Sequence, residues 1–229
     1  MCEPAYIEAR PRTEEEIANL PYCTTILDAA ERRGVSQVVH FTTTSGVVGI
    51  LAAKAVKSRK RLPKEEYLEY VYQPNAEIRK DVVWLDYVNL SIERINDWMF
   101  DHSERWHAGS GNPWVLLSFH PRILTHPGVV FTTTNNIYPL CRRAEGLDGF
   151  LQMFTEPVYG RYGVKHNRAN KLASWPTDRQ AEVLYPGDLS CTNLQRIYVQ
   201  LEESLDTVHG ILGGLNMDVP VSLAPEVFE

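Results

Sequence analysis

Glu182 is the residue of this sequence whose position best suits catalysis. It follows a polar, irregular stretch that begins at Trp175, and it opens a short run, EVLY, that predicts a β-strand. A sheet would hold this carboxylate rigidly, as a base or a fixed negative charge, while the preceding loop presents a substrate. Most glutamates at strand ends are surface residues, so the spacing alone leaves both interpretations open.

A second group of residues suits the binding of nucleic acid. Five basic side chains fall within nineteen positions, interleaved with rings at Phe154, Tyr159 and Tyr162. Cations that follow phosphates and rings that stack on bases are what a single strand requires. Such runs are more often solvated faces, and the formal net charge is −6, although a local basic patch can bind phosphates on an acidic protein. This basic strip consists of Arg161, Lys165, Arg168, Lys171 and Arg179.

The remaining reactive residue types indicate little chemistry by themselves. A lone histidine in an apolar run, such as His40 in VVHF, is more often a satisfied core residue than a ligand. The sequence lacks the glycine-rich nucleotide-binding motifs, the HExxH zinc motif and the GxSxG elbow of serine hydrolases. The cysteines are scattered and show no CxxC spacing, so we expect reduced thiols and no zinc site. They are Cys2, Cys23, Cys141 and Cys191.

The elements that must position these residues follow from the hydrophobic spacing. Helices are expected early and once late, with short strands in the middle and at the end, and residues 133–181 look irregular. This is an α+β pattern rather than regular βαβ alternation. The predicted helices are 14–20, 26–33, 47–56 after an N-cap at Ser45, 63–72 and 201–215; the predicted strands are 37–42, 87–92, 114–119, 128–132, 182–185, 194–201 and 219–223.

Composition indicates a single globular domain over residues 1–229, because no linker or composition break divides the chain. The content of hydrophobic residues is 44%, enough for a sizeable core. No apolar run approaches the roughly 18 residues of a membrane helix. The N-terminus shows no basic stretch followed by an apolar run, so we expect no secretory signal and a cytoplasmic location.

Four segments carry a resemblance to a known family. They are Val39-His40-Phe41-Thr42 with a following helix that ends in Lys57-Ser58-Arg59, Asp86 to Ile92 with Asn96, Trp114 to Leu124 with Val130-Phe131-Thr132 and Asn135-Asn136, and Trp175 to Pro186 with PTDRQAEVL. In this order they resemble the DarT family, bacterial toxins that ADP-ribosylate DNA bases using NAD. The resemblance covers residues 37–201. It is closer to the branch with a Ser-Ile-x-x-x-Asn block, and Arg94 lies one position away from the arginine of the other branch.

The resemblance implies an ADP-ribosyltransferase fold, in which a split antiparallel β core with peripheral helices binds NAD in its cleft. It also makes the chemistry expected of Glu182 specific. Breaking the bond between ribose and nicotinamide develops positive charge on the sugar, which a carboxylate stabilises. The same carboxylate can accept the proton of an attacking base nitrogen. Nicotinamide is already a cationic leaving group, so no metal is expected.

The resemblance further implies an NAD-binding set. His40 would hydrogen-bond the ribose hydroxyls, with Thr42 nearby. Ser91 would face nicotinamide, unless its hydroxyl bonds the backbone. Asn96 would either position NAD or cap a helix that begins at the next residue, and Arg59 completes the set.

Single-stranded DNA, bound by the basic strip, and an antitoxin protein are the partners that the resemblance implies. Two alternatives stay open. The acceptor could be RNA, protein arginine or a small molecule, because no recognisable reader of the 2′-hydroxyl is present. The chain could also be a degenerate module that binds NAD or nucleic acid without turnover, although intact Glu182, His40 and Ser91 argue against it.

Overall fold

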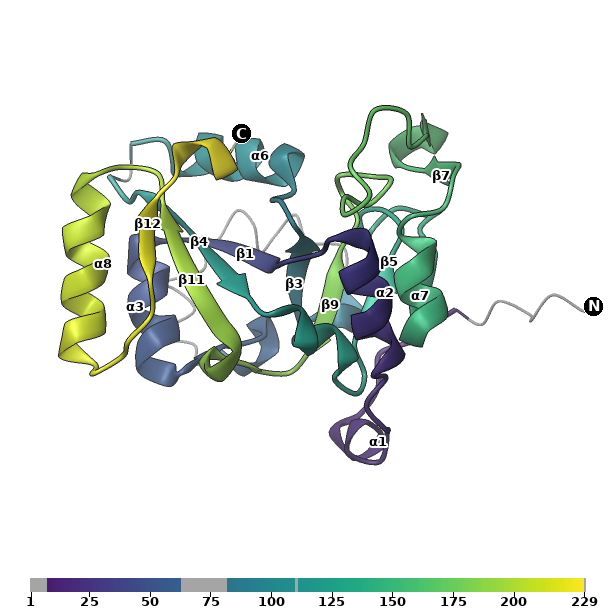
Figure 1. Ribbon diagram of the computed structural model, residues 1–229, viewed down its shortest axis with the longest axis horizontal. Helices are drawn as coiled ribbons and strands as arrows, with labels where there is room; N and C mark the ends of the chain where they lie inside the picture. The colour runs from purple at the N-terminus through teal and green to yellow at the C-terminus, as the bar shows by residue number, and fades with distance from the viewer. Residues whose placement is uncertain (1–7, 63–81, 110, 229) are drawn as a thin grey trace, which may run out of the picture.

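The structure is a computed structural model that describes residues 8–62, 82–109 and 111–228. Within this part of the chain, the largest sheet has eight strands in the order β12-β11-β4-β1-β3-β9-β5-β6 (Figure 1). The β11–β12 pair is parallel and the other pairs are antiparallel. The strands are β1 (Val38–Thr43), β3 (Tyr87–Ile92), β4 (Trp114–Phe119), β5 (Val130–Thr132), β6 (Arg143–Glu145), β9 (Val183–Pro186), β11 (Leu194–Val199) and β12 (Val221–Leu223).

The sheet divides between its two central strands, β1 and β3. Two residue pairs join them, Val38 with Ile92 and Val39 with Ser91. By contrast, β1 pairs with β4 over six residues, and β3 pairs with β9 over four. The halves β12-β11-β4-β1 and β3-β9-β5-β6 are therefore joined at one end of the β1–β3 boundary and unpaired along the rest. This is the split antiparallel core that the resemblance implies.

Helices cover both faces of the first half, which explains why every residue of β4 is buried. Val115 and Leu117 share a hydrophobic cluster with residues of α3 (Thr44–Ala53) and α8 (Glu203–Gly214). Trp114 and Leu116 pack instead with Phe100 of α6 (Asp97–His107). Alternate side chains of a strand point to opposite faces, so α6 lies on the face opposite α3 and α8. Figure 1 shows α3 and α8 side by side.

The second half is covered by α2 (Thr25–Arg33) and α7 (Gly146–Gln152), which lie against each other (Figure 1). Phe150 of α7 packs edge-on against Phe131 of β5, with ring centroids 5.6 Å apart. The short helix α1 (Glu14–Ala18) lies at the lower end of this half in Figure 1. Residues 14–33 therefore lie with the half of the sheet that carries β9 and Glu182.

Short elements complete the description. β2 (Ala55–Val56) pairs with β10 (Leu189–Ser190), and β7 (Val158–Tyr159) pairs with β8 (Lys165–His166) in a hairpin. The 3₁₀ segments are Arg59–Arg61, Val82–Trp84, Pro121–Thr125, Arg161–Gly163, Cys191–Asn193 and Pro225–Phe228. None of the helices in the described ranges combines the length and apolar character that crossing a bilayer requires.

Local signals predict several element ends well. Thr13 and Glu16 form the expected capping box at α1. Gly34 ends α2 in the left-handed region, with φ 74°. The predicted helix 47–56 is shifted, because α3 begins at Thr44, is capped by Thr43 rather than Ser45, and ends at Ala53. The predicted helix 63–72 lies outside the described residues.

The prediction of an irregular stretch over residues 133–181 is wrong. This stretch contains β6, α7 and the β7–β8 hairpin. The helix has seven residues, of which Gly146 and Gly149 are poor helix formers, and each hairpin strand has two residues. Elements this short give no periodicity that a sequence window can detect.

Candidate active site

A cavity of about 290 Å³ lies where β1 and β3 stop pairing. Its walls come from both strands, from α3 and the segment after it, and from the start of α6. All six residues that the sequence predicts for NAD binding and catalysis line this one cavity: His40, Thr42, Arg59, Ser91, Asn96 and Glu182. The split in the sheet therefore brings together residues that lie 142 positions apart, from His40 to Glu182.

Glu182 precedes β9, and its backbone is fixed by Thr132 of β5. The Thr132 amide donates to the Glu182 carbonyl at 2.9 Å, and the Glu182 amide donates to Thr132 Oγ1 at 2.9 Å. Thr132 is fully buried. Strand β5 thus holds both the amide and the carbonyl of Glu182, one residue before β9 begins.

Two amide groups hold the carboxylate of Glu182. Asn89 Nδ2 of β3 donates to Oε1 at 3.0 Å, and the backbone N–H of Asn136 donates to Oε2 at 2.8 Å. The side chain is buried, with 9% of the residue exposed. Among the described residues that line the cavity, Glu182 is the only carboxylate. Hydrogen bonds to the ionised form favour a charged carboxylate, which is the form needed to stabilise positive charge.

His40 and Asn89 connect the two halves of the split sheet. His40 Nδ1 lies 3.0 Å from the carbonyl oxygen of Asn89. A carbonyl only accepts hydrogen bonds, so Nδ1 carries a proton; when the imidazole is neutral, Nε2 is then its acceptor nitrogen. Thr42 is two residues along β1 from His40, and Ser91 is two residues along β3 from Asn89. The period of a strand puts each pair on one face.

The two remaining members of the NAD-binding set lie at element ends. Asn96 is buried and caps α6, because its side chain accepts a hydrogen bond from the Met99 amide at 3.1 Å. It also lines the cavity, so capping and ligand binding are compatible. Arg59 begins a 3₁₀ turn after β2, and the prediction that Lys57-Ser58-Arg59 ends the preceding helix is wrong. Strand β2, which pairs with β10, lies between α3 and Lys57-Ser58-Arg59 along the chain.

The structure divides the basic strip into two kinds of residue. The Arg168 guanidinium donates to the carbonyls of Trp175 and Leu172, at 2.9 and 2.8 Å. Lys171 Nζ donates to the carbonyl of Thr177. Burial lowers the pKa of both side chains. These two cations brace the loop that leads to Glu182, and their role in nucleic-acid binding stays a prediction.

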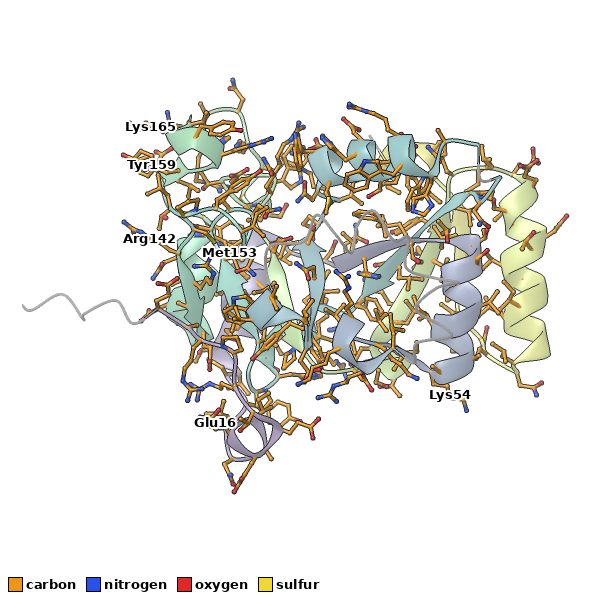
Figure 2. All side chains as sticks on the ribbon, turned by 180° about the vertical axis from the view of Figure 1, so that it is seen from behind. Glu16, Lys54, Arg142, Met153, Tyr159 and Lys165 are labelled. Atoms are coloured by element: carbon orange, nitrogen blue, oxygen red, sulfur yellow. The ribbon has the colours of Figure 1, made fainter. Side chains whose placement is uncertain are left out.

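The other three cations of the strip are exposed. Arg161 lies between two rings, 5.6 Å from the Trp98 centroid and 4.7 Å from that of Tyr162. Arg179 pairs with Asp97 at the start of α6. Lys165 lies on the β7–β8 hairpin, which Figure 2 shows projecting from the body of the molecule with Tyr159. Arg94 stacks on Trp175 at 4.4 Å and is not among the described residues that line the cavity.

Sequence reasoning misses the two residues that hold the carboxylate. Asn89 is a polar residue in the apolar run YVNLSI, and this exception to the pattern is a usable signal. Asn136 contributes only its backbone N–H. Nearly every residue type has this group, so the sequence gives no signal for it. Its loop follows β5, and only the tertiary fold brings it to Glu182.

A comparison of the sequence with family models identifies a family. The model described as DarT, ssDNA thymidine ADP-ribosyltransferase, matches residues 39–229. The chain belongs to the DarT family. It is therefore an NAD-dependent enzyme that transfers ADP-ribose to a nucleic-acid base in single-stranded DNA, as the sequence predicts. A search of curated proteins finds no match.

Solved structures confirm the fold. Thermus sp. 2.9 DarT in complex with NAD+ is 17% identical, with a TM-score of 0.61, over 85% of this chain and 98% of that one. Thermus sp. 2.9 DarT in complex with ADP-ribosylated ssDNA is 15% identical, with a TM-score of 0.63, over 86% and 97%. Thermosipho africanus DarTG in complex with ADP-ribose is 11% identical, with a TM-score of 0.56, over 84% of this chain and 51% of that one.

In the described part of the chain, the cysteines are buried or half-buried and none lines the DarT cavity. Cys23, Cys141 and Cys191 are free thiols, and burial raises the pKa of Cys141 and of Cys191 to about 11. Such thiols stay protonated at neutral pH and are poor nucleophiles. Among the described residues, no group of three or more His, Cys, Asp or Glu side chains is arranged to hold a metal ion.

Proposed function

We propose that Glu182 is the catalytic carboxylate of ADP-ribose transfer to thymidine in single-stranded DNA. The observation that carries this assignment is its position: it is the only carboxylate among the described residues that line the cavity, and two amide donors fix both its oxygens. A carboxylate so held is preorganised for the positive charge that develops on the ribose. It needs no reorientation when the bond to nicotinamide breaks.

The proposed reaction exchanges one C–N bond at ribose C1′ for another and transfers one proton. The C–N bond between ribose C1′ and nicotinamide breaks, and its electron pair leaves with neutral nicotinamide. A nitrogen of the base forms the new bond to C1′ and loses its proton, which Glu182 accepts. Asn89 and the Asn136 amide hold the carboxylate in place to receive that proton.

The NAD side of the proposal rests on what the cavity offers. In its neutral form, His40 offers Nε2 as an acceptor to a ribose hydroxyl, because Nδ1 donates to the Asn89 carbonyl. Arg59 and Lys57 also line the cavity and supply positive charge for the pyrophosphate. Thr42, Ser91 and Asn96 are further polar groups of the same cavity.

The acceptor side of the proposal uses the exposed part of the basic strip. Tyr162 is 88% exposed, with Arg161 against its ring. Rings and guanidinium groups stack on unpaired bases, while cations such as Lys165 follow phosphates. Arg161 also contacts Trp98 of α6, the helix whose first turn lines the cavity. A strand bound there would have its bases close to Glu182.

The test uses wild type, Glu182→Gln and, as a control, Glu31→Gln, which changes an exposed glutamate of α2. Each protein is incubated with NAD and with oligonucleotides that either contain or lack thymidine, in DNA and matched RNA versions. Mass spectrometry then detects added ADP-ribose, and nicotinamide release is followed in parallel.

We expect one ADP-ribose on thymidine-containing DNA, with both signals lost in Glu182→Gln and kept in Glu31→Gln. Modification of RNA would replace the acceptor and leave the role of Glu182 intact. A Glu182→Gln variant that turns over at the wild-type rate would contradict the assignment of the catalytic carboxylate.

An antitoxin that reverses the modification or blocks the site is the protein partner we propose. The resemblance of the chain to a family of toxins supports it. The growth of cells that express the wild type is compared with that of cells that express Glu182→Gln, to test whether the activity is toxic. Equal growth would mean that the activity is not toxic and would contradict the need for an antitoxin.

A further inference from the structure

One of the two groups that hold Glu182 depends on Arg143 of β6. The bond to Glu182 Oε2 comes from the backbone N–H of Asn136, in the loop between β5 and β6. Arg143 makes two hydrogen bonds to Asn136. Its Nε donates to Asn136 Oδ1 at 2.6 Å, and its Nη2 donates to the backbone carbonyl of Asn136. A third contact runs from Nη1 to the carbonyl of Cys141, at 3.2 Å.

In the part of the chain that the structure describes, the side chain of Asn136 leaves one of its own polar atoms without a hydrogen bond in this loop conformation. The residue is 2% exposed, yet among the described residues its Nδ2 has no hydrogen-bond partner. An unsatisfied buried donor opposes this conformation, and the hydrogen bonds from the planar guanidinium of Arg143 offset that cost. The side chain of Arg143 is itself largely buried, with 15% exposed.

Residues 8–12, the N-terminal strap, are attached to the same strand. The Ala9 amide donates to the Arg143 carbonyl at 2.8 Å, and Glu8 pairs with the Arg143 guanidinium. Two residues further along β6, Glu145 accepts from Arg12 Nε at 2.5 Å. The strap lies outside residues 39–229, which match the DarT model.

We infer that Arg143 is a positioning residue for Glu182, and that the N-terminal strap holds Arg143 in place. The contacts form one chain, from the strap through Arg143 and Asn136 to the carboxylate. The inference rests on the proposed role of Glu182. It assigns a function in catalysis to an N-terminal segment that the family match does not cover.

The first experiment compares Arg143→Gln and Arg143→Lys with Arg142→Gln. Arg142 is the matched control, because it is the neighbouring arginine, is exposed, and points away from the body of the molecule in Figure 2. Nicotinamide release in the presence of single-stranded DNA gives kcat and the KM for NAD. Thermal unfolding of each variant establishes that it is folded at the assay temperature.

We expect kcat of Arg143→Gln to fall about tenfold to a hundredfold, since small displacements of a catalytic group have effects of that order. The KM for NAD should change less than about twofold, because the loss is confined to the transition state. Arg143→Lys should recover part of kcat, because an ammonium can make one of the two bonds to Asn136. A purely structural role would lower the unfolding temperature without this split between kcat and KM.

The second experiment detaches the strap without shortening the chain. The double variant Glu8→Ala/Arg12→Gln removes both side-chain contacts to β6, and Arg10→Gln is its control, since Arg10 pairs with Glu16 instead. We expect kcat of the double variant to fall about threefold to tenfold, and to fall little further when Arg143→Gln is added, because the changes act through one chain of contacts.

The outcomes separate this inference from the proposed function. If Glu182→Gln abolishes turnover while Arg143→Gln keeps the wild-type kcat, the inference is wrong and the role of Glu182 stands. If Glu182→Gln retains turnover, the proposed role of Glu182 is wrong, and the inference that rests on it is wrong as well. If the strap variant and Arg143→Gln lose kcat additively, the strap does not act through Arg143.

Discussion

The side chain of Asn89 donates to Glu182 at 3.0 Å, across the pair of strands β3 and β9. The backbone oxygen of the same residue faces His40 Nδ1 of β1. Asn89 therefore links the carboxylate to the other half of the split sheet, at the point where the halves stop pairing. A small change in the opening of the split would move His40 and Glu182 relative to each other.

Replacing Asn89 by Asp should reduce kcat more than replacing it by Ala. Ala removes one donor to the carboxylate, a contact worth about 1.5–3 kcal/mol when one partner is charged, so kcat should fall roughly tenfold to a hundredfold. Asp puts a second carboxylate beside Glu182, which disfavours the charged form. Nicotinamide release with single-stranded DNA measures both. Asn193→Asp, at a half-buried position outside the cavity, controls for the added charge, and equal rates for wild type and Asn89→Asp would refute the expectation.

The strands that carry the site could be predicted from the sequence. The apolar runs at 87–92 and 114–119 predict β3 and β4 with the bounds that the structure has. Burial on both faces makes β4 apolar at every position except Ser118. Burial of one face gives part of β3 its alternation of buried and half-buried residues. The family resemblance then selects the ADP-ribosyltransferase fold from among the α+β arrangements.

The split in the sheet could not be predicted from the strands themselves. Val39 and His40 are equally ordinary strand residues, yet β3 pairs with the first and not with the second. Pairing is a long-range property, and no local pattern marks where it stops. The same limit applies to Arg161 and Arg168: both are arginines of one loop region, and only the converging carbonyls around Arg168 separate a brace from a surface cation.

The two kinds of basic residue should respond differently to substitution. Lys165→Gln should weaken binding of single-stranded DNA and reduce the slope of log affinity against log salt concentration by about 0.7, the value for one lost phosphate contact. Arg168→Gln should instead lower the unfolding temperature by about 2–6 °C, as loss of a partly exposed brace of about 1–2 kcal/mol predicts. Fluorescence anisotropy at several salt concentrations and thermal unfolding measure the two effects. An unchanged unfolding temperature in Arg168→Gln would count against its bracing role.

Gly160→Ala should impair the use of DNA more than the binding of NAD. A Cβ at this position would lie 2.5 Å from His166 Nε2 and 3.0 Å from Asp178 Oδ2. Asp178 is fully buried and is fixed by Thr134 Oγ1 at 2.5 Å, so the β7–β8 hairpin has to move. Because the hairpin region carries Lys165 and Tyr162, we expect the KM for DNA to rise about fivefold or more while the KM for NAD stays within about twofold. Gly210→Ala, on α8 with no atom within 4 Å of the added Cβ, is the control. Equal changes in both KM values would mean that the hairpin also shapes the NAD cavity.

His126 should make the folded protein less stable as the pH falls below about 6.5, the ordinary pKa of histidine. Burial lowers its pKa, and the charge of Arg122 adds to the effect. Its Nδ1 lies 2.7 Å from the hydroxyl of Tyr185, whose pKa burial raises to about 12, so the phenol keeps its proton and can donate to a neutral imidazole. The unfolded chain therefore binds the extra proton first, and the free energy of unfolding decreases as the pH falls from the unfolded pKa towards the lower folded one.

In His126→Asn this part of the pH dependence should be absent, and the free energy of unfolding should fall less between pH 7 and pH 5. Part of the slope should remain, because burial also lowers the pKa of His107 and of His120. Urea unfolding at a series of pH values measures the slope, and His209→Asn, at an exposed position of α8, controls for the loss of an imidazole. If His126→Asn keeps the full wild-type slope, burial of His126 does not contribute to the pH dependence of stability.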